Sequence, residues 1–99
     1  MSRAQKLLHE KLIDELGNIE ELVIWAVPKT SKYPDGIRYR FVYVNKVREQ
    51  IYVLYDNHYP KGHHRHIKDS EEPYPYKDIR QLIEDFKRDV QEVMKHENS

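Results

Sequence analysis

The sequence contains no cysteine, and this absence excludes disulfides, thiolate zinc sites, iron–sulfur clusters and cysteine nucleophiles. It also lacks a run of about 18 consecutive apolar residues, the length that a membrane-spanning helix requires. No signal or transit peptide is visible, because Lys6, Glu10 and Lys11 interrupt the apolar residues near the N-terminus. We therefore expect a cytoplasmic protein that does not enter membranes.

An excess of charge of either sign is missing too, since 17 basic side chains balance 17 acidic ones. Glycine and proline are few, at 3 and 5 residues, and they separate patterned segments without forming a linker. A length of 99 residues suits one hydrophobic core, because single domains commonly contain about 100–200 residues. We expect a single domain over residues 1–99.

Both ends of the chain carry apolar residues at helical spacing. Over about residues 2–16 these are Leu8, Leu12, Ile13 and Leu16, and over about residues 76–96 they are Ile79, Leu82, Ile83, Phe86, Val90, Val93 and Met94. Ser2 would cap the first helix, and Gly17 would take the left-handed conformation after it. Each helix would bury its apolar stripe against a sheet.

The middle of the chain favours β-strands, since short runs rich in branched and aromatic residues end at turn residues. These runs are residues 22–27, 37–44 and 50–56, with residues 64–68 as a short additional edge strand. Alternation in the second run places Arg38 and Arg40 on the face opposite its aromatic side chains. We predict an α+β fold in which an antiparallel sheet of three or four strands is covered by an N-terminal helix and a long C-terminal helix, in the order α-β-β-β-(β)-α.

Basic residues are concentrated in the predicted strand region. Residues 29–68 contain nine basic and three acidic side chains, so the rest of the chain is acidic. Five tyrosines are interleaved with these cations, namely Tyr33, Tyr39, Tyr43, Tyr52 and Tyr55. Cations for phosphates and rings for bases suit single-stranded nucleic acid, with Arg38 and Arg40 as candidate contacts. Alternatively, the acidic helices merely neutralise a basic sheet.

Four of the six histidines fall within nine residues. In an extended segment His64 and His66 point to one face, about 6–7 Å apart by strand rise, while His63 and Arg65 point to the other. Two imidazoles can supply a general base and a general acid when an RNA 2′-hydroxyl attacks its own phosphate. Arg65 or Lys61 would then stabilise the anionic transition state.

The same histidines could instead hold a metal ion. His64 and His66, together with the Asp56 carboxylate or His58, would suit zinc or another divalent transition metal. The spacing matches no zinc-finger template. The sequence therefore leaves three alternatives open: a cofactor-free acid–base site, a metal site, and a solvated loop at a sheet edge.

Two neighbouring motifs resemble a known family, the TumE-type toxins of toxin–antitoxin systems. The motifs are Tyr55-Asp56-Asn57-His58 and His63-His64-Arg65-His66. The family pattern is tyrosine-aspartate-asparagine at a strand end, a short loop with proline and histidine, and then histidine-x-histidine. The upstream strands and the closing helix also look similar, so the resemblance covers residues 22–90. The sequence departs from the pattern in its short loop before the histidines and in the acidic, tyrosine- and proline-containing segment after them.

The resemblance implies a cytoplasmic type II toxin of bacteria or archaea that acts on RNA and is inhibited by a small antitoxin protein. Its motif residues would be Asp56, Asn57, His64 and His66, with His58 and His63 in support.

The resulting hypothesis is a ribonuclease in which His64 and His66 are acid and base and Asp56 orients an imidazole. The proposed substrate contacts are Arg38, Arg40, Asn57, His58, Lys61, His63 and Arg65. A metal-binding module and a non-catalytic interaction protein remain as alternatives, and formation of a homodimer stays open.

Overall fold

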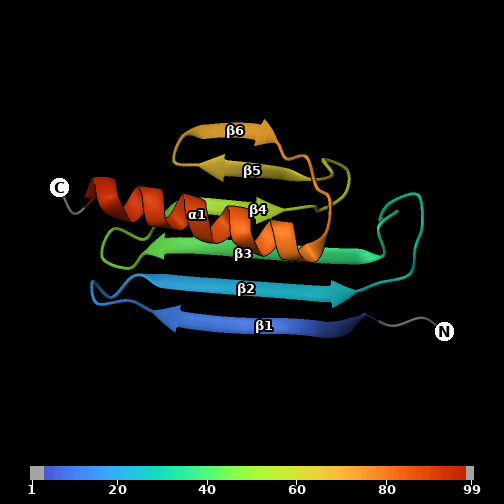
Figure 1. Cartoon of the computed structure of the whole chain (residues 1–99), viewed down its shortest axis with the longest axis horizontal. Coiled ribbons are helices and arrows are strands. Elements are labelled where there is room, and N and C mark those ends of the chain that lie inside the picture. The colour runs from blue at the N-terminus through green and yellow to red at the C-terminus, as the bar shows by residue number, and fades with distance from the viewer. Residues whose placement is uncertain (1–3, 98–99) are drawn as a thin grey trace.

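The computed structural model describes residues 4–97. Within this range six strands form one antiparallel sheet, in the order β1-β2-β3-β4-β5-β6, and a helix follows them (Figure 1). The elements are β1 (Gln5–Ile13), β2 (Ile19–Ala26), β3 (Ile37–Asn45), β4 (Gln50–Asp56), β5 (His64–Ile67), β6 (Ser70–Pro73) and α1 (Ile79–Glu97). The α+β class, the antiparallel sheet and the long C-terminal helix are confirmed.

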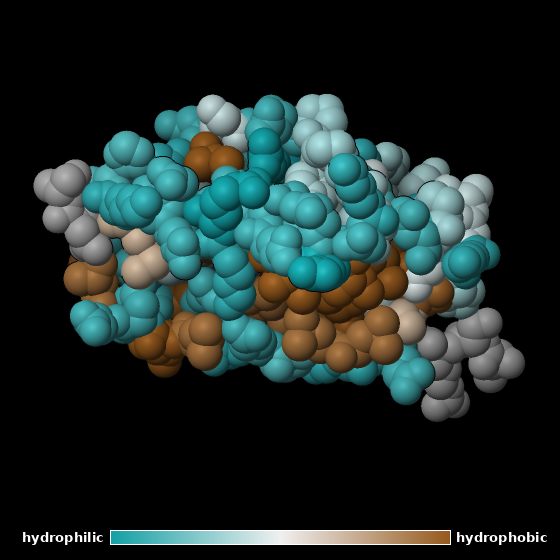
Figure 2. All heavy atoms as spheres, in the orientation of Figure 1, coloured by the Kyte–Doolittle hydropathy of each residue, from teal (hydrophilic) through white to brown (hydrophobic). Residues whose placement is uncertain are grey.

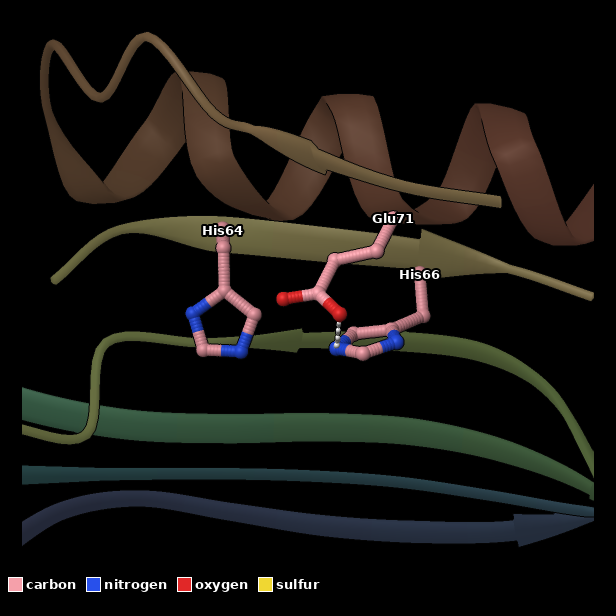
Figure 3. A group of neighbouring side chains, drawn as sticks. All are labelled: His64, His66 and Glu71. Carbon is pink, nitrogen blue, oxygen red and sulfur yellow. Dashed lines mark ion pairs between the residues drawn. The ribbon is translucent and has the colours of Figure 1, made fainter. Parts of the chain in front are cut away.

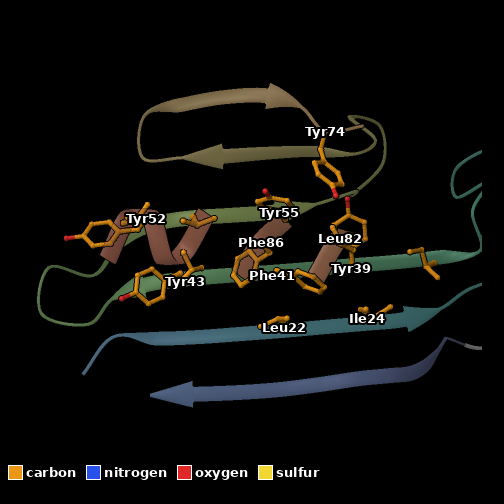
Figure 4. Packing of buried hydrophobic residues seen from close by; sticks show 14 residues of the cluster. Leu22, Ile24, Tyr39, Phe41, Tyr43, Tyr52, Tyr55, Tyr74, Leu82 and Phe86 are labelled. Carbon is orange, nitrogen blue, oxygen red and sulfur yellow. The ribbon is translucent and has the colours of Figure 1, made fainter. Parts of the chain in front are cut away.

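Helix α1 crosses β3 and β4 and buries its apolar stripe against them (Figures 1 and 4). The ring of Phe86 packs edge-on against Phe41 and Tyr55, with centroid distances of 5.3 and 5.5 Å. Leu82 and Val90 extend the same buried stripe along the helix. Burial of each large side chain contributes about 1.5–3 kcal/mol, so this contact fixes the helix on one face of the sheet.

The prediction of an N-terminal helix is wrong, because this segment forms strand β1 and pairs with β2. Leu8 and Leu12 are four residues apart, a spacing that places two side chains on one face of either a helix or a strand. Gly17 does have a positive φ of 83°, but it lies in the turn of a β-hairpin. In that turn the Asp14 carboxylate accepts hydrogen bonds from two backbone N–H groups. Ser2 lies outside the described residues.

The predicted count of three or four strands is also wrong. The expected strands at residues 22–27, 37–44, 50–56 and 64–68 are present as β2, β3, β4 and β5. Strands β1 and β6 flank them, so that β5 is not an edge strand. Strand β6 has four exposed residues and ends at Pro73, features that resemble a loop in the sequence.

The two faces of the sheet carry different side chains. On the α1 side, Tyr39, Tyr43, Tyr52 and Tyr55 are buried in the core. These four rings therefore do not form the exposed platform that the sequence suggested. The opposite face is called the far face below, and it carries Arg38 and Arg40, as predicted from the alternation in β3.

Apolar side chains also remain exposed on the helix side, between α1 and the outer edge of β1 (Figure 2). In strand β1, Leu7, Leu12 and Ile13 are exposed by 52%, 49% and 69%. Strand β1 thus has an apolar surface as well as one edge without a neighbouring strand in the described chain.

Candidate functional site

Asp56 and His64 lie opposite each other in the register of β4 and β5 and point to the far face. The Nε2 of His64 is 3.1 Å from Oδ1 of Asp56, and both side chains are mostly buried. The Nδ1–H of His64 donates to the carbonyl oxygen of Gly62 at 2.8 Å, which fixes the ring. A proton on Nε2 would lie between the ring and the carboxylate, so this pair can hold and pass on a proton.

His66 lies beside His64 on the same face of β5 (Figure 3). The ring centroids are 5.2 Å apart and the planes are inclined by 68°. Glu71, opposite His66 in β6, directs its carboxylate between the two rings (Figure 3), and its Oε2 is 3.8 Å from Nε2 of His66. The alternation predicted from the sequence therefore brings two imidazoles together, and β6 adds a carboxylate that the sequence did not reveal.

The carboxylate of Glu71 is also bound by Lys61, whose Nζ donates to Oε1 at 2.7 Å. The hydrogen bond from Lys61 lowers the pKa of Glu71 below its usual value, so the carboxylate is ionised near neutral pH. Lys61 therefore reaches the histidine pair, but it is already paired with an acidic residue. One ligand atom from each of His64, His66 and Glu71 lies within 4.8 Å of the others, an arrangement that could hold a metal ion.

Arg38 and Arg40 form the cationic part of the far face. Arg40 lies opposite Asp56 in the register of β3 and β4, and Arg38 lies opposite Trp25 in β2. The guanidinium of Arg38 is 4.8 Å from the centroid of the Trp25 ring. Neither arginine forms an ion pair within residues 4–97, whereas Lys61, Arg65 and Lys68 each do.

Two pockets lie on either side of the Asp56–His64 pair. The first has a volume of about 360 Å³ and is lined by Trp25, Arg38, Tyr39, Arg40, Asp56 and His58. The second has about 400 Å³ and is lined by Lys61, His63, His64, Glu71, Glu72 and Pro73. Asp56 lines the first pocket and His64 lines the second, so a ligand in either pocket can contact one member of the pair.

His63 and Arg65 point to the α1 side, as the alternation predicted, although His63 also lines the second pocket. Arg65 donates to Glu72 at 2.6 Å and to Asp89 at 3.3 Å. The Nε2–H of His63 donates to Asp35 at 2.8 Å, and its Nδ1 accepts from the Tyr39 hydroxyl at 2.9 Å. Both side chains are bonded to groups on the α1 side, so neither is placed to contact a substrate bound at Arg38 and Arg40 on the far face.

Asn57 and His58 mark the exit from β4. Asn57 is buried, and its amide accepts from the backbone N–H of Tyr39 and donates to the carbonyl of Ile37, both at 2.9 Å. This side chain therefore joins β4 to β3 and is not exposed to a ligand. His58 is exposed at the rim of the first pocket, and its backbone N–H lies 3.3 Å from Oδ1 of Asp56.

Sequence reasoning missed two residues of the site, Trp25 and Glu71. Trp25 lies within the predicted strand at residues 22–27, but its position beside Arg38 depends on the register between β2 and β3. Glu71 lies in a segment whose acidic and proline-rich composition indicated a loop. Only the pairing of strands could have placed either residue next to the histidines and arginines.

The fold and site together define a small α+β protein with a histidine–carboxylate pair on the cationic far face of an antiparallel sheet. A family model described as Toxin TumE matches residues 4–94. The chain therefore belongs to the TumE toxin family, and the resemblance based on the two motifs is confirmed. Membership in this family indicates a toxin of a toxin–antitoxin system and implies an antitoxin partner.

Comparisons with curated proteins and with solved structures give no significant match. No helix within residues 4–97 is long and apolar enough to cross a membrane.

Proposed function

We propose that this protein is the toxin of a type II toxin–antitoxin system and cleaves RNA in the cytoplasm without a cofactor. The observation that carries the proposal is the position of the Asp56–His64 pair, next to His66 on one side and, on the other, opposite Arg40, which forms no ion pair within residues 4–97. Acid, base and phosphate-binding cation are the three groups that transesterification of RNA requires.

The two histidines take different roles in this proposal. His66 is the general base that accepts the proton of the 2′-hydroxyl, because its Nε2 lies 3.8 Å from Glu71, beyond hydrogen-bonding distance. The 2′-oxygen then attacks phosphorus and the bond to the 5′-oxygen breaks. His64 donates to the leaving 5′-oxygen the Nε2 proton that it shares with Asp56, while the Gly62 carbonyl keeps the ring in place through Nδ1.

Arg40, with Arg38 beside it, binds the phosphate in this scheme. Both are free of ion pairs in the described part of the chain and lie on the same face as the histidines. Arg65 instead joins β5 to β6 through Glu72 and to α1 through Asp89. Lys61 would contribute a third cation if substrate displaced it from Glu71.

Expression in a bacterial host tests this function. The wild-type chain should arrest growth, and the double variant His64→Ala/His66→Ala should not, because loss of proton transfer lowers the rate by about a hundredfold or more. His9→Ala is the matched control. His9 is an exposed histidine on the same face, and it lies in β1 at the far end of the row of cross-strand neighbours that includes His64 in β5. Equal toxicity of the double variant and the wild type would overturn the catalytic role of the histidines.

A second candidate function is metal binding at His64, His66 and Glu71. The proximity of their ligand atoms supports it, and two histidines with one glutamate form a donor set that suits zinc. The ionised Glu71 would have to leave Lys61 to serve as a ligand. Stoichiometric metal after purification without a tag, with a lower melting temperature after chelation, would support this function, and a metal-free protein of full activity would exclude it.

The antitoxin is proposed to bind at the edge of β1. Strand β6, at the other edge, has four residues, two of them glutamates, and ends in proline, which are features that prevent further pairing. Strand β1 has nine residues, no proline, and exposed side chains at Leu7 and Leu12. An antitoxin segment that adds a strand to β1 would satisfy its free backbone groups and cover these leucines.

A further inference from the structure

Trp25 is the only tryptophan of the chain, and it lies on the far face. The other aromatic rings of the strands, from Tyr39 and Phe41 to Tyr55, lie on the α1 side in the core. Within the described strands, Trp25 is therefore the one large aromatic ring on the far face, and it is only partly buried. Its location requires an explanation other than packing beneath α1.

Two cations flank this ring in the sheet. Arg38 in β3 and Lys6 in β1 are the cross-strand partners of Trp25, and the Arg38 guanidinium lies 4.8 Å from the ring centroid. An aromatic ring between cations is the arrangement with which proteins bind unpaired nucleobases, since the ring stacks on the base and the cations bind the adjacent phosphates.

The spacing between the Trp25 ring and the histidine site suits the binding of a base and its adjacent phosphate. Arg40 follows Arg38 by two residues in β3, which is about 6.8 Å of strand rise on the same face, and Arg40 lies opposite Asp56. Trp25, Arg38, Arg40 and Asp56 line one pocket of about 360 Å³. This volume is at the lower end of the range for small-ligand sites and suits a single nucleoside.

We infer that Trp25 and Arg38 form a nucleobase subsite, in which one unpaired base of a single-stranded RNA stacks on Trp25 while its phosphate binds at Arg40, next to Asp56 and His64. This inference rests on the proposed action on RNA and names the form of RNA that the site accepts. Bases within a duplex are stacked on their neighbours and are not accessible to such a ring.

Intrinsic fluorescence reports on this subsite directly, because Trp25 is the only tryptophan. The probes are a short single-stranded 2′-O-methyl oligoribonucleotide, which lacks the attacking hydroxyl, the same backbone with abasic positions, and the corresponding duplex. The single strand should quench the emission in a saturable manner. The abasic strand and the duplex should bind more weakly by about fivefold or more and should quench less.

Variants measured by the anisotropy of a labelled single strand complete the test. Trp25→Ala should weaken binding by about fivefold or more, Trp25→Phe should retain most of the affinity, and Tyr59→Ala, which removes an exposed loop ring, should have no effect. Equal affinity of the abasic and base-containing strands, or unchanged binding by Trp25→Ala, would overturn the subsite. A wild-type protein that binds the single strand with quenching but does not cut the unmodified strand would contradict the proposed cleavage and leave the subsite intact.

Discussion

The Nε2 of His64 lies 3.1 Å from Oδ1 of Asp56, across the register of two neighbouring strands. The ring is held from its other side by the Gly62 carbonyl. A second aspartate–histidine pair, Asp35 and His63 at 2.8 Å, lies on the α1 side of the sheet and leads into the core at Tyr39. The two pairs have similar chemistry, but Asp56–His64 lies on the far face with Arg38 and Arg40. This difference allows a matched test.

Asp56→Asn removes the carboxylate that orients the His64 ring in the proposed mechanism. We expect the rate of RNA cleavage to fall by about a hundredfold, the usual effect of impaired general acid–base catalysis. Asp35→Asn makes the same chemical change in the other pair and should leave the rate unchanged. Single-turnover cleavage assays with both variants measure this difference. Equal losses in the two variants would show that Asp56 has no special role.

Arg40→Ala and Arg65→Ala should separate binding from stability. Arg40 is exposed and has no ion pair in the described chain, so its loss should weaken RNA binding and reduce the dependence of affinity on salt by about one counterion. Arg65 holds Glu72 and Asp89, so its loss should lower the free energy of unfolding by about 1–2 kcal/mol without changing RNA affinity. Titrations at several salt concentrations and urea unfolding measure the two effects. The opposite pattern would place the phosphate contact on the α1 side.

The change in the free energy of unfolding at acidic pH should depend on Tyr74. Burial opposes ionisation of Asp85, but hydrogen bonds from Tyr74, Gln81 and Arg88 outweigh it and hold the pKa of this carboxyl below its usual value. Because the folded pKa is lowered, Asp85 stabilises the fold above about pH 4, and this contribution is lost as the pH falls through the folded pKa.

Tyr74→Phe removes the shortest of these hydrogen bonds, which measures 2.5 Å. The variant should lose about 1.5–3 kcal/mol of unfolding free energy near neutral pH, and less at strongly acidic pH, where Asp85 is protonated. Urea unfolding over a pH series measures this change, with Tyr76→Phe as a control for removal of a hydroxyl group from the same segment. A loss that is constant with pH would contradict the link to Asp85.

The antitoxin interface makes a separate prediction. Leu7→Asp/Leu12→Asp replaces two exposed apolar side chains of β1 with charged ones and should abolish co-purification with the antitoxin. Val47→Asp changes a residue that is 86% exposed in the turn after β3 and should leave the complex intact. Size-exclusion chromatography of the toxin alone shows whether β1 also pairs with a second copy. A complex that survives the β1 variant would place the antitoxin elsewhere.

Sequence periodicity predicted the parts of the fold that local patterns define. The long helix is visible because seven apolar residues from Ile79 to Met94 repeat at three and four residues, and the aromatic alternation of β3 predicted its two faces. Strand β1 could not be recognised, because the spacing of Leu8 and Leu12 fits both a helix and a strand. Only the pairing of this segment with β2 selects the strand. Strand β6 lacks any buried residue.

For the candidate site, too, the sequence predicted only the features that local spacing determines. A period of two residues was sufficient to place His64 and His66 together and Arg65 on the opposite face. The partners of these histidines depend on strand register, which no local pattern contains. Trp25 and Glu71 therefore appear only in the folded chain, and the arginines that remain unpaired can be identified only once the ion pairs of Lys61 and Arg65 are known.

We propose that His64 and His66 perform acid–base chemistry on RNA. The decisive assay incubates a defined single-stranded RNA with the purified wild-type protein and with His64→Ala/His66→Ala, after confirming that both are folded. We expect the wild type to form a product with a 2′,3′-cyclic phosphate and the variant to cleave more slowly by about a hundredfold or more. Cleavage by the variant at the wild-type rate would rule out this role of the histidines.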